Sequence, residues 1–126
     1  MVENDVSLAI LECAVEVHRT LGGPGLLESV YEEALVWELQ QRSLQAKRQV
    51  ALPIRYKGMT LATPLKIDLI VADLVIVECK ATTSYSNVFE AQALTYLRLT
   101  GMKLALVINF GERLVKNGIH RVVNGL

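Results

Sequence analysis

Two ionisable side chains end an otherwise apolar run, LVIVECK, whose composition indicates a buried strand. They are Glu78 and Lys80, and side chains two positions apart on a strand point to the same face of its sheet. Burying an ionised group costs several kcal/mol unless the group is paired or holds a metal ion. The spacing therefore indicates either an ion pair or a site at which the two charges do chemistry.

A third charge, Asp68, lies in the preceding apolar run, LKIDLIV. If residues 72–73 formed a plain two-residue turn, Asp68 would oppose Val77 and point away from Glu78. A three-residue loop over the same connection, or an equivalent bulge, would place Asp68 directly opposite Glu78. Two carboxylates that face each other repel, and a divalent cation between them reverses the sign of that energy.

Oxygen ligands of this kind suit Mg²⁺ or Mn²⁺, which usually keep several waters and bind proteins through one or two carboxylates. Beside such an ion, Lys80 could orient or deprotonate an attacking water, or stabilise negative charge that grows on a phosphate. The alternative is a salt bridge from Lys80 to Glu78 or Asp68 on a solvated face of the sheet. The spacing D-x₉-E-x-K leaves both interpretations open.

Two further polar pairs fall on predicted helices. The segment GLLESVY places Glu28 and Tyr31 on one helix face, and EAQALTYLR does the same for Gln92 and Tyr96. Glu28 lies in a first turn, where a carboxylate also favours the helix dipole, so capping is its alternative role. The alternative for the second pair is an ordinary amphipathic helix with a half-buried tyrosine.

The elements that must position these residues follow from the apolar periodicity, which predicts helices over residues 5–21, 26–42 and 87–100. Strands are predicted over 48–56, where Pro53 favours an edge strand or a bulge, from 59 through 71 with an interruption near Pro64, and over 74–80, 103–110 and 119–123. The run KLALVINF is typical of a central strand covered on both faces. The order α-α-β-β-β-α-β-β predicts a single α/β or α+β domain over residues 1–126.

The composition is that of a folded protein without a strong charge. Hydrophobic residues make up 52% of the 126, three residues are proline, and thirteen Lys and Arg balance thirteen Asp and Glu. This balance argues against a protein that coats a polyanion and leaves room for a local basic patch. No apolar run approaches the roughly 18 residues of a membrane span, and the N-terminus has no basic leader region. We therefore expect a soluble protein of the reducing cytoplasm with no membrane partner.

The cysteines and histidines give no sign of a disulfide framework or a zinc site. Cys13 and Cys79 form no C-x-x-C pair, and only His18 and His120 could join them as ligands. Cys79 alternates with the two charges of its strand, so its thiol should face the apolar side as an inert core group.

Together these segments resemble the GxxExxY proteins, a branch of the PD-(D/E)XK nuclease-like superfamily. GLLESVY matches the signature, and KIDLIV, VIVECKA, EAQALTYL, GMKLALVINFG and GIHRVV continue the match in order over nearly the whole chain. The resemblance implies an α/β fold with a restriction-endonuclease-like core. That core is a central mixed sheet flanked by helices, of topology αβββαβ, and here it would carry an extra N-terminal helix.

The resemblance also implies a catalytic metal site of four residues: Glu28, Asp68, Glu78 and Lys80. The three carboxylates would hold Mg²⁺ or Mn²⁺, with the main-chain carbonyl of Cys79 as a further ligand. Gln92 and Tyr96 reproduce the Q-x-x-x-Y motif of RecB-like nucleases, whose side chains help to position the substrate and the catalytic lysine. Tyr31 is expected to join them in positioning the substrate.

The sequence departs from the family pattern at one loop. The family usually reads LGPG there, whereas this chain reads LGGPG over residues 21–25, one glycine longer. The extra residue precedes the second helix, so Glu28 should keep its place while the first helix could dock differently. His18, just before the loop, has a counterpart in the family and is predicted to be a packed or capping residue.

The resemblance implies a hydrolase that cuts nucleic-acid phosphodiester bonds with Mg²⁺ or Mn²⁺, with DNA expected rather than RNA. One alternative is a nucleic-acid-binding or protein-interaction module that keeps the nuclease fold without cutting, because the charge is neutral and the candidate cations are scattered. Another is a structural protein whose charges pair only with each other. A homodimer would double the basic surface, although the sequence shows no interface. The candidate cations are Arg42, Lys47, Arg48, Arg55, Lys57 and Lys66.

Overall fold

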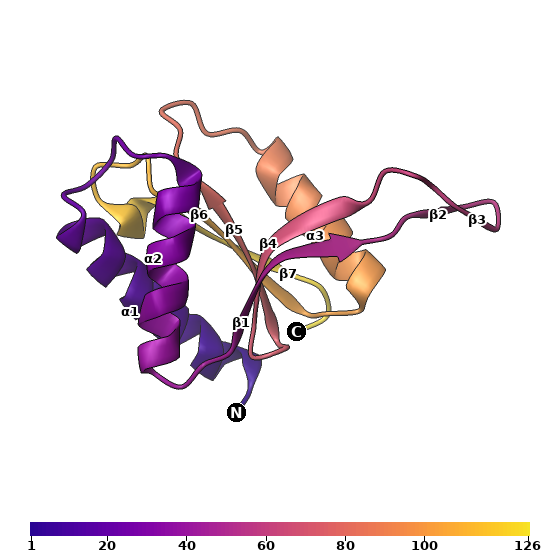
Figure 1. Cartoon of the computed structure of the whole chain (residues 1–126), viewed down its shortest axis with the longest axis horizontal. Coiled ribbons are helices and arrows are strands. Elements are labelled where there is room, and N and C mark those ends of the chain that lie inside the picture. Colours follow the sequence, from indigo (N-terminus) through magenta and orange to yellow (C-terminus); the bar gives the residue numbers. More distant parts are fainter.

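The computed structural model describes residues 1–126 and arranges them around a five-stranded mixed sheet (Figure 1). The helices are α1 (Glu3–Thr20), α2 (Glu28–Gln41), α3 (Val88–Thr100) and the short 3₁₀ helix η1 (Val115–Gly118). The strands are β1 (Ala46–Leu52), β2 (Arg55–Tyr56), β3 (Met59–Thr60), β4 (Leu65–Val71), β5 (Val75–Lys80), β6 (Leu104–Asn109) and β7 (Ile119–Val123). The sheet order is β1-β4-β5-β6-β7, with β5 and β6 parallel and the other neighbours antiparallel.

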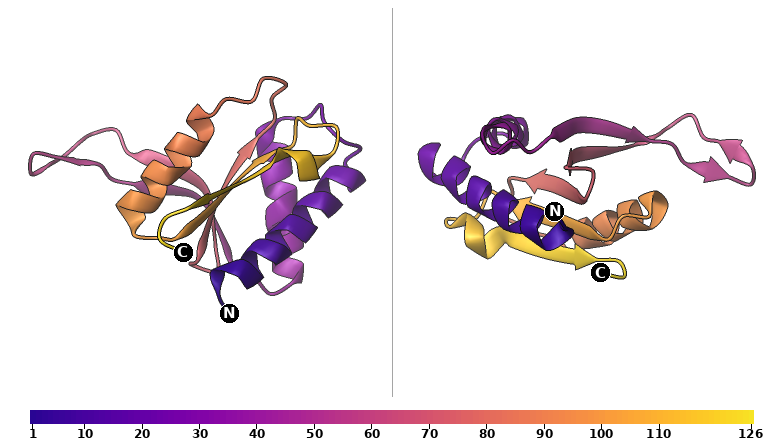
Figure 2. Two further views of the ribbon diagram at one scale, coloured as in Figure 1. Left: turned by 180° about the vertical axis from the view of Figure 1, so that it is seen from behind. Right: turned by 90° about the horizontal axis from the view of Figure 1, so that it is seen from below.

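Helices cover both faces of the sheet, as Figures 1 and 2 show. The larger hydrophobic cluster joins α1 and α2 to alternate residues of the inner strands, such as Val77 and Leu106. The smaller cluster joins α3 to the residues between them, such as Ile76 and Val107. All six residues of β6 are buried, which confirms the predicted strand covered on both faces. Cys79 is buried in the larger cluster, as the alternation along its strand predicts.

The helix ends show why the chain turns where it does. α2 begins at Glu28 with Leu27 as its N-cap residue, so the glutamate lies in the first turn. α3 ends at Gly101, where a φ of 75° is left-handed and the N–H donates to the Leu97 carbonyl at 2.9 Å. None of the helices is both long enough and apolar enough to cross a membrane.

The connection between β4 and β5 decides which residues face each other across this pair. Leu69 pairs with Val77, and three residues, 72–74, separate the paired strands. The first two of these have a left-handed backbone, with φ of 54° and 55°, which gives a tight turn of the hairpin type followed by one extra residue. Extending the register by one position places Asp68 opposite Glu78. The three-residue loop is therefore the alternative that the structure confirms.

The strand predicted over 48–56 is wrong as a single element. β1 ends at Leu52, and the separate strand β2 begins at Arg55. Pro53 follows β1 directly and has no N–H to donate to a sheet ladder. β2 pairs only with β3, and we call the segment 53–64 that holds both of them the arm. The arm projects beyond the sheet, at the end of the molecule opposite α1 and α2, in every view (Figures 1 and 2).

Candidate active site

Asp68 and Glu78 interrupt the hydrogen-bond ladder between β4 and β5, whose regular pairing ends at Leu69 and Val77. The Asp68 backbone N–H donates to Oε2 of Glu78 at 2.8 Å. In return, the backbone N–H of Cys79 donates to Oδ2 of Asp68 at 2.8 Å. Each carboxyl group thus takes the place of a main-chain acceptor on the neighbouring strand. The two side chains are fixed at the point where the strands part.

The surroundings of Glu78 favour its neutral form. The side chain is 5% exposed, and its burial raises the pKa from 4.5 to about 8. The nearby charge of Asp68 raises this pKa further, whereas the Asp68 N–H and the charge of Lys80 oppose the shift. At neutral pH and without a further cation, Glu78 therefore holds a proton beside the Asp68 carboxylate.

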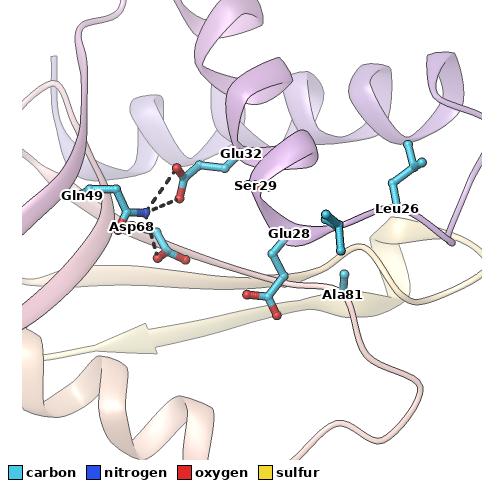
Figure 3. A pocket seen from close by; sticks show the side chains of 8 residues that line it. Leu26, Glu28, Ser29, Glu32, Gln49, Asp68 and Ala81 are labelled. Carbon is cyan, nitrogen blue, oxygen red and sulfur yellow. Dashed lines mark hydrogen bonds between the residues drawn. The ribbon is translucent and has the colours of Figure 1, made fainter.

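A pocket of about 520 Å³ opens beside Asp68 at the N-terminal end of α2 (Figure 3). Glu28, the first residue of α2, lines it together with Asp68. Ala81, directly after β5, forms another part of the wall. The structure therefore brings the predicted helix carboxylate and the predicted strand carboxylate to one pocket, with Glu78 buried next to Asp68.

Glu32 also lines this pocket, although the sequence patterns did not predict it there. It is buried, lines the pocket one helical turn after Glu28, and forms an ion pair with Arg48 at 2.9 Å. Its Oε1 accepts a hydrogen bond from Nε2 of Gln49 at 3.0 Å, and the same nitrogen lies 3.5 Å from Oδ1 of Asp68 (Figure 3). The available signal was the i, i+4 spacing from Glu28, which puts both carboxylates on one helix face.

Gln49 reaches these carboxylates because the edge strand is distorted at this residue. Its φ of 51° is left-handed, a conformation that costs a non-glycine residue about 1–3 kcal/mol. The β1–β4 pairing omits Gln49 and Asp68 but keeps one register on either side, so no residue is inserted. Asp68 thus lies where the ladders to both of its neighbouring strands are interrupted.

Asn109 fixes the chain segment that leaves β5. It is buried at the end of β6, and its Oδ1 accepts the N–H groups of Thr82 at 3.0 Å and Gly111 at 2.9 Å. Its Nδ2 donates back to the Thr82 carbonyl at 3.0 Å. These bonds anchor the backbone two residues after Lys80, so the end of β5 is held against β6.

A comparison with protein families shows where this arrangement belongs. The family model described as PD-(D/E)XK nuclease superfamily matches residues 4–122. The chain belongs to the PD-(D/E)XK nuclease superfamily. Comparisons with curated proteins and with solved structures gave no match. Superfamily membership supports a nuclease-type function, and the mixed sheet flanked by three α-helices is consistent with the predicted restriction-endonuclease-like fold.

Nucleases of the PD-(D/E)XK superfamily generally use divalent metal ions, and the donors present fit such an ion chemically. Asp68 and Glu78 offer hard oxygen ligands, and neither forms an ion pair with Lys or Arg. No three or more His, Cys, Asp or Glu side chains are gathered closely enough to hold a metal together. The predicted cluster is present as two pairs: Asp68 with Glu78 through hydrogen bonds, and Asp68 with Glu28 across the pocket.

Lys80 forms neither of the salt bridges considered as alternatives, to Glu78 or to Asp68. Its Nζ instead lies 4.7 Å from the centre of the Phe89 ring, in a cation–π contact with the start of α3. The ammonium is half-buried and still close enough for its charge to lower the pKa of Glu78.

The predicted Q-x-x-x-Y pair lies on α3, across from the same carboxylates. Tyr96 is buried in the smaller cluster, and its pKa is raised by burial and then by the charges of Glu78 and Asp68. Gln92, one turn earlier, is exposed and has no hydrogen-bond partner within the chain. Their roles in positioning a substrate remain predictions.

Tyr31 lies in the core, where its ring stacks on Phe110 with the ring centres 4.6 Å apart. Its hydroxyl donates to the Gly23 carbonyl at 2.8 Å and accepts from the Leu26 N–H at 3.2 Å. These bonds tie the glycine-rich loop to α2 and so help to position Glu28; the predicted contact of Tyr31 with substrate remains a prediction. His18 is buried with Nε2 3.2 Å from the Phe110 carbonyl oxygen, which confirms a packed histidine.

Proposed function

We propose that the protein is a divalent-metal-dependent nuclease that hydrolyses phosphodiester bonds, with DNA as its substrate rather than RNA. The observation that supports this most strongly is the Asp68–Glu78 pair. Two carboxyl groups on neighbouring strands face each other beside a pocket that also holds Glu28. If both groups were ionised they would repel each other, and a divalent cation between them would offset that repulsion.

Glu28, Asp68 and Glu78 would hold Mg²⁺ or Mn²⁺, with the main-chain carbonyl of Cys79 as a further ligand. When bound, such an ion lowers the pKa of a nearby water and offsets the charge of the scissile phosphate. Glu78 gives up its proton to take part, because its pKa of about 8 keeps it protonated at neutral pH. The proton leaves to solvent, and Asp68 stays hydrogen-bonded to the Cys79 N–H.

Lys80 supplies the positive charge on the side of α3. In our proposal its ammonium orients the attacking water or stabilises the negative charge that develops on the phosphate. The contact with Phe89 holds the side chain without neutralising it, since an aromatic ring leaves the ammonium fully charged. Gln92 lies on the exposed surface of α3, where its amide could donate to a phosphate or a base, and Tyr96 is buried one turn later.

The test is cleavage of labelled single-stranded and double-stranded DNA, and of the matching RNA, with and without Mg²⁺ or Mn²⁺. The wild-type protein should cut only with metal, and Asp68→Ala and Lys80→Ala should lower the rate by at least about 100-fold, the range seen for single catalytic groups. Glu33→Ala and Lys103→Ala change exposed residues outside the site and should cut like the wild type. Cleavage that survives both site variants would show that the proposal is wrong.

A second candidate function is a module that binds nucleic acid without cutting it. The zero formal net charge favours it, because a duplex footprint is neutralised by several Lys and Arg on one surface. The same assays separate the two functions. Salt-dependent binding without turnover in either metal would support the module and count against the nuclease.

A further inference from the structure

The charges of this neutral protein are unevenly placed along the chain. Residues 39–67 hold six of the thirteen Lys and Arg and none of the thirteen Asp and Glu. They include β1, the arm and the first residues of β4, so the positive charge lies on the strands that lead to Gln49 and Asp68. Five of the six cations therefore lie on the edge strand β1, on the arm or at the start of β4, and the sixth, Arg42, is the C-cap residue of α2.

Three of these six cations are neutralised by ion pairs, and three are not. Arg42 pairs with Glu12, Lys47 with Asp73 and Arg48 with Glu32. The remaining cations are exposed and form no ion pair: Arg55, Lys57 and Lys66. Two of them lie on the arm, and Lys66 lies at its root, paired with Ala51 across β1 and β4.

The arm has a defined shape that keeps its cations apart from the body of the protein. Tyr56 pairs with Met59 around a turn in which Lys57 and Gly58 both have positive φ, of 49° and 81°, a tight hairpin turn. The Arg55 guanidinium donates to the Gly58 carbonyl at 3.1 Å and braces the tip. The arm extends into solvent, and neither helical layer covers it (Figures 1 and 2).

The arm also exposes apolar side chains that a solvated turn does not need. Tyr56 is 55% exposed and Met59 is 62% exposed, on neighbouring strands of a two-stranded hairpin. An isolated two-stranded hairpin is only marginally stable. The exposed aromatic and thioether groups do not pack in the core of the protein, and exposed apolar groups of this kind mark surfaces that contact a partner. Tyr56 also carries the Lys57 ammonium 5.4 Å from its ring centre, which joins a flat apolar surface to a positive charge.

We infer that the arm, with Lys66 at its root, is a binding surface for the phosphate backbone of the nucleic acid that the proposed active site cuts. This inference rests on the proposed function for the identity of the bound polyanion. The arm ends at Pro64, four residues before Asp68, so it joins β4 about 13 Å along the strand from that carboxyl group. A strand held on Arg55 and Lys57 would run from the arm toward the pocket, with Tyr56 against a sugar or a base.

The test measures binding separately from cutting. The wild-type protein is titrated against a short labelled DNA duplex, and against one of its strands, over a range of salt concentrations with EDTA present. The arm variant carries Arg55→Gln, Lys57→Gln and Lys66→Gln. The matched control carries Arg98→Gln, Lys103→Gln and Lys116→Gln, which remove the same charge from exposed residues that form no ion pairs.

The arm variant should bind at least tenfold more weakly than the control. Its slope of log affinity against log salt should be shallower by about 2.7 on the duplex or about 2 on the single strand, because each lost phosphate contact removes about 0.9 or 0.7. Tyr56→Ala should weaken single-strand binding about tenfold and duplex binding less if the ring stacks on a base. Unchanged circular dichroism and thermal midpoints show that the fold is intact.

Equal binding by the arm variant and the control would overturn the inference, as would a wild type that binds neither DNA. If the arm variant lost a dimer present in the wild type, the arm would be a contact between copies, and the inference would also be overturned. Cleavage is scored separately. If DNA binding depends on the arm but the wild type never cuts, the inference about the arm is supported and the proposed nuclease activity is contradicted. If the wild type cuts with metal but its binding does not depend on the arm, the nuclease proposal is supported and the inference about the arm is overturned.

Discussion

Asp68 and Glu78 each bond to the strand that carries the other: Glu78 accepts the Asp68 N–H, and Asp68 accepts the N–H of the residue after Glu78. The two carboxyl groups are therefore held together by the backbone, although they would repel each other if both were ionised. Burial and that repulsion raise the pKa of Glu78 to about 8. The site thus keeps one proton that it can exchange for a cation, and this exchange leads to measurable effects.

The first prediction concerns stability against pH without metal. The pKa of Glu78 is raised on folding, from 4.5 to about 8, so its stabilising contribution is complete below pH 4.5 and is lost as the pH rises to about 8. Across that interval the wild type should lose stability relative to Glu78→Gln, which cannot ionise, by up to roughly 1 kcal/mol per pH unit at the middle of the interval. Urea unfolding of both proteins with EDTA at several pH values measures the difference. Parallel curves for the two proteins would contradict the raised pKa.

The second prediction concerns protons released by metal binding. Mn²⁺ should displace the Glu78 proton at pH 7, where that carboxyl is still protonated, so about one proton leaves for each ion bound. Calorimetric titration in two buffers of different ionisation enthalpy counts the protons directly. The apparent affinity should rise up to pH 8 and then level. Glu78→Gln should release no proton, and a wild type that binds Mn²⁺ without proton release would argue against Glu78 as a ligand.

The third prediction concerns the buried carboxylate that holds Gln49 in place. Glu32→Ala removes the ion pair with Arg48 and the hydrogen bond to Gln49, and should lower the free energy of unfolding by about 1–3 kcal/mol. The loss stays below that of a fully buried pair because the Arg48 side chain is 39% exposed and can turn to water. Chemical denaturation measures it. Glu33→Ala, an exposed neighbour on α2, should stay within about 0.5 kcal/mol, and equal effects of the two changes would contradict this account.

The fourth prediction separates two roles of Tyr31. Tyr31→Phe keeps the stacking on Phe110 and removes the bonds to Gly23 and Leu26, so it should cost about 1 kcal/mol of stability. Tyr56→Phe, which removes an exposed hydroxyl that makes no hydrogen bond, should cost less than about 0.5 kcal/mol. If Tyr31 acts only through the loop, the variant should keep its affinity for DNA at temperatures where it is folded. A large rise in KM there would place its hydroxyl on the substrate.

The paired carboxylates were accessible from the sequence because strands obey simple rules. Alternation puts Glu78 and Lys80 on one face, and a loop of either two or three residues leaves only two registers for Asp68. The structure selects the three-residue loop through two consecutive left-handed residues, at 72–73. These residues are Ala72 and Asp73. Aspartate favours turns, but the pair lacks the Asn-Gly or Asp-Gly sequence typical of such a turn, so propensity alone does not choose this register.

The i, i+4 spacing places Glu32 on the helix face of Glu28, but no local rule predicts that Glu32 is buried or that Gln49 reaches it. The burial of Glu32 depends on how α2 packs against β1. Its partners, Arg48 and Gln49, lie on β1, which is joined to the end of α2 by a loop. The left-handed backbone at Gln49 has no signature in an ordinary strand sequence. The arm was hidden for a similar reason, since the alternation over 48–56 continues through Pro53 while the chain leaves the sheet there.

The most direct test of the central claim is a crystal structure of the protein soaked in Mn²⁺, with anomalous scattering to locate the ion. The account predicts one peak between the carboxylates of Asp68 and Glu78, with Glu28 turned toward it from α2 and the Cys79 carbonyl among the ligands. The Asp68→Ala protein, soaked in the same way, should show no peak there. A peak elsewhere, or none in a wild-type crystal at a pH above 8 where Glu78 is ionised, would contradict the account.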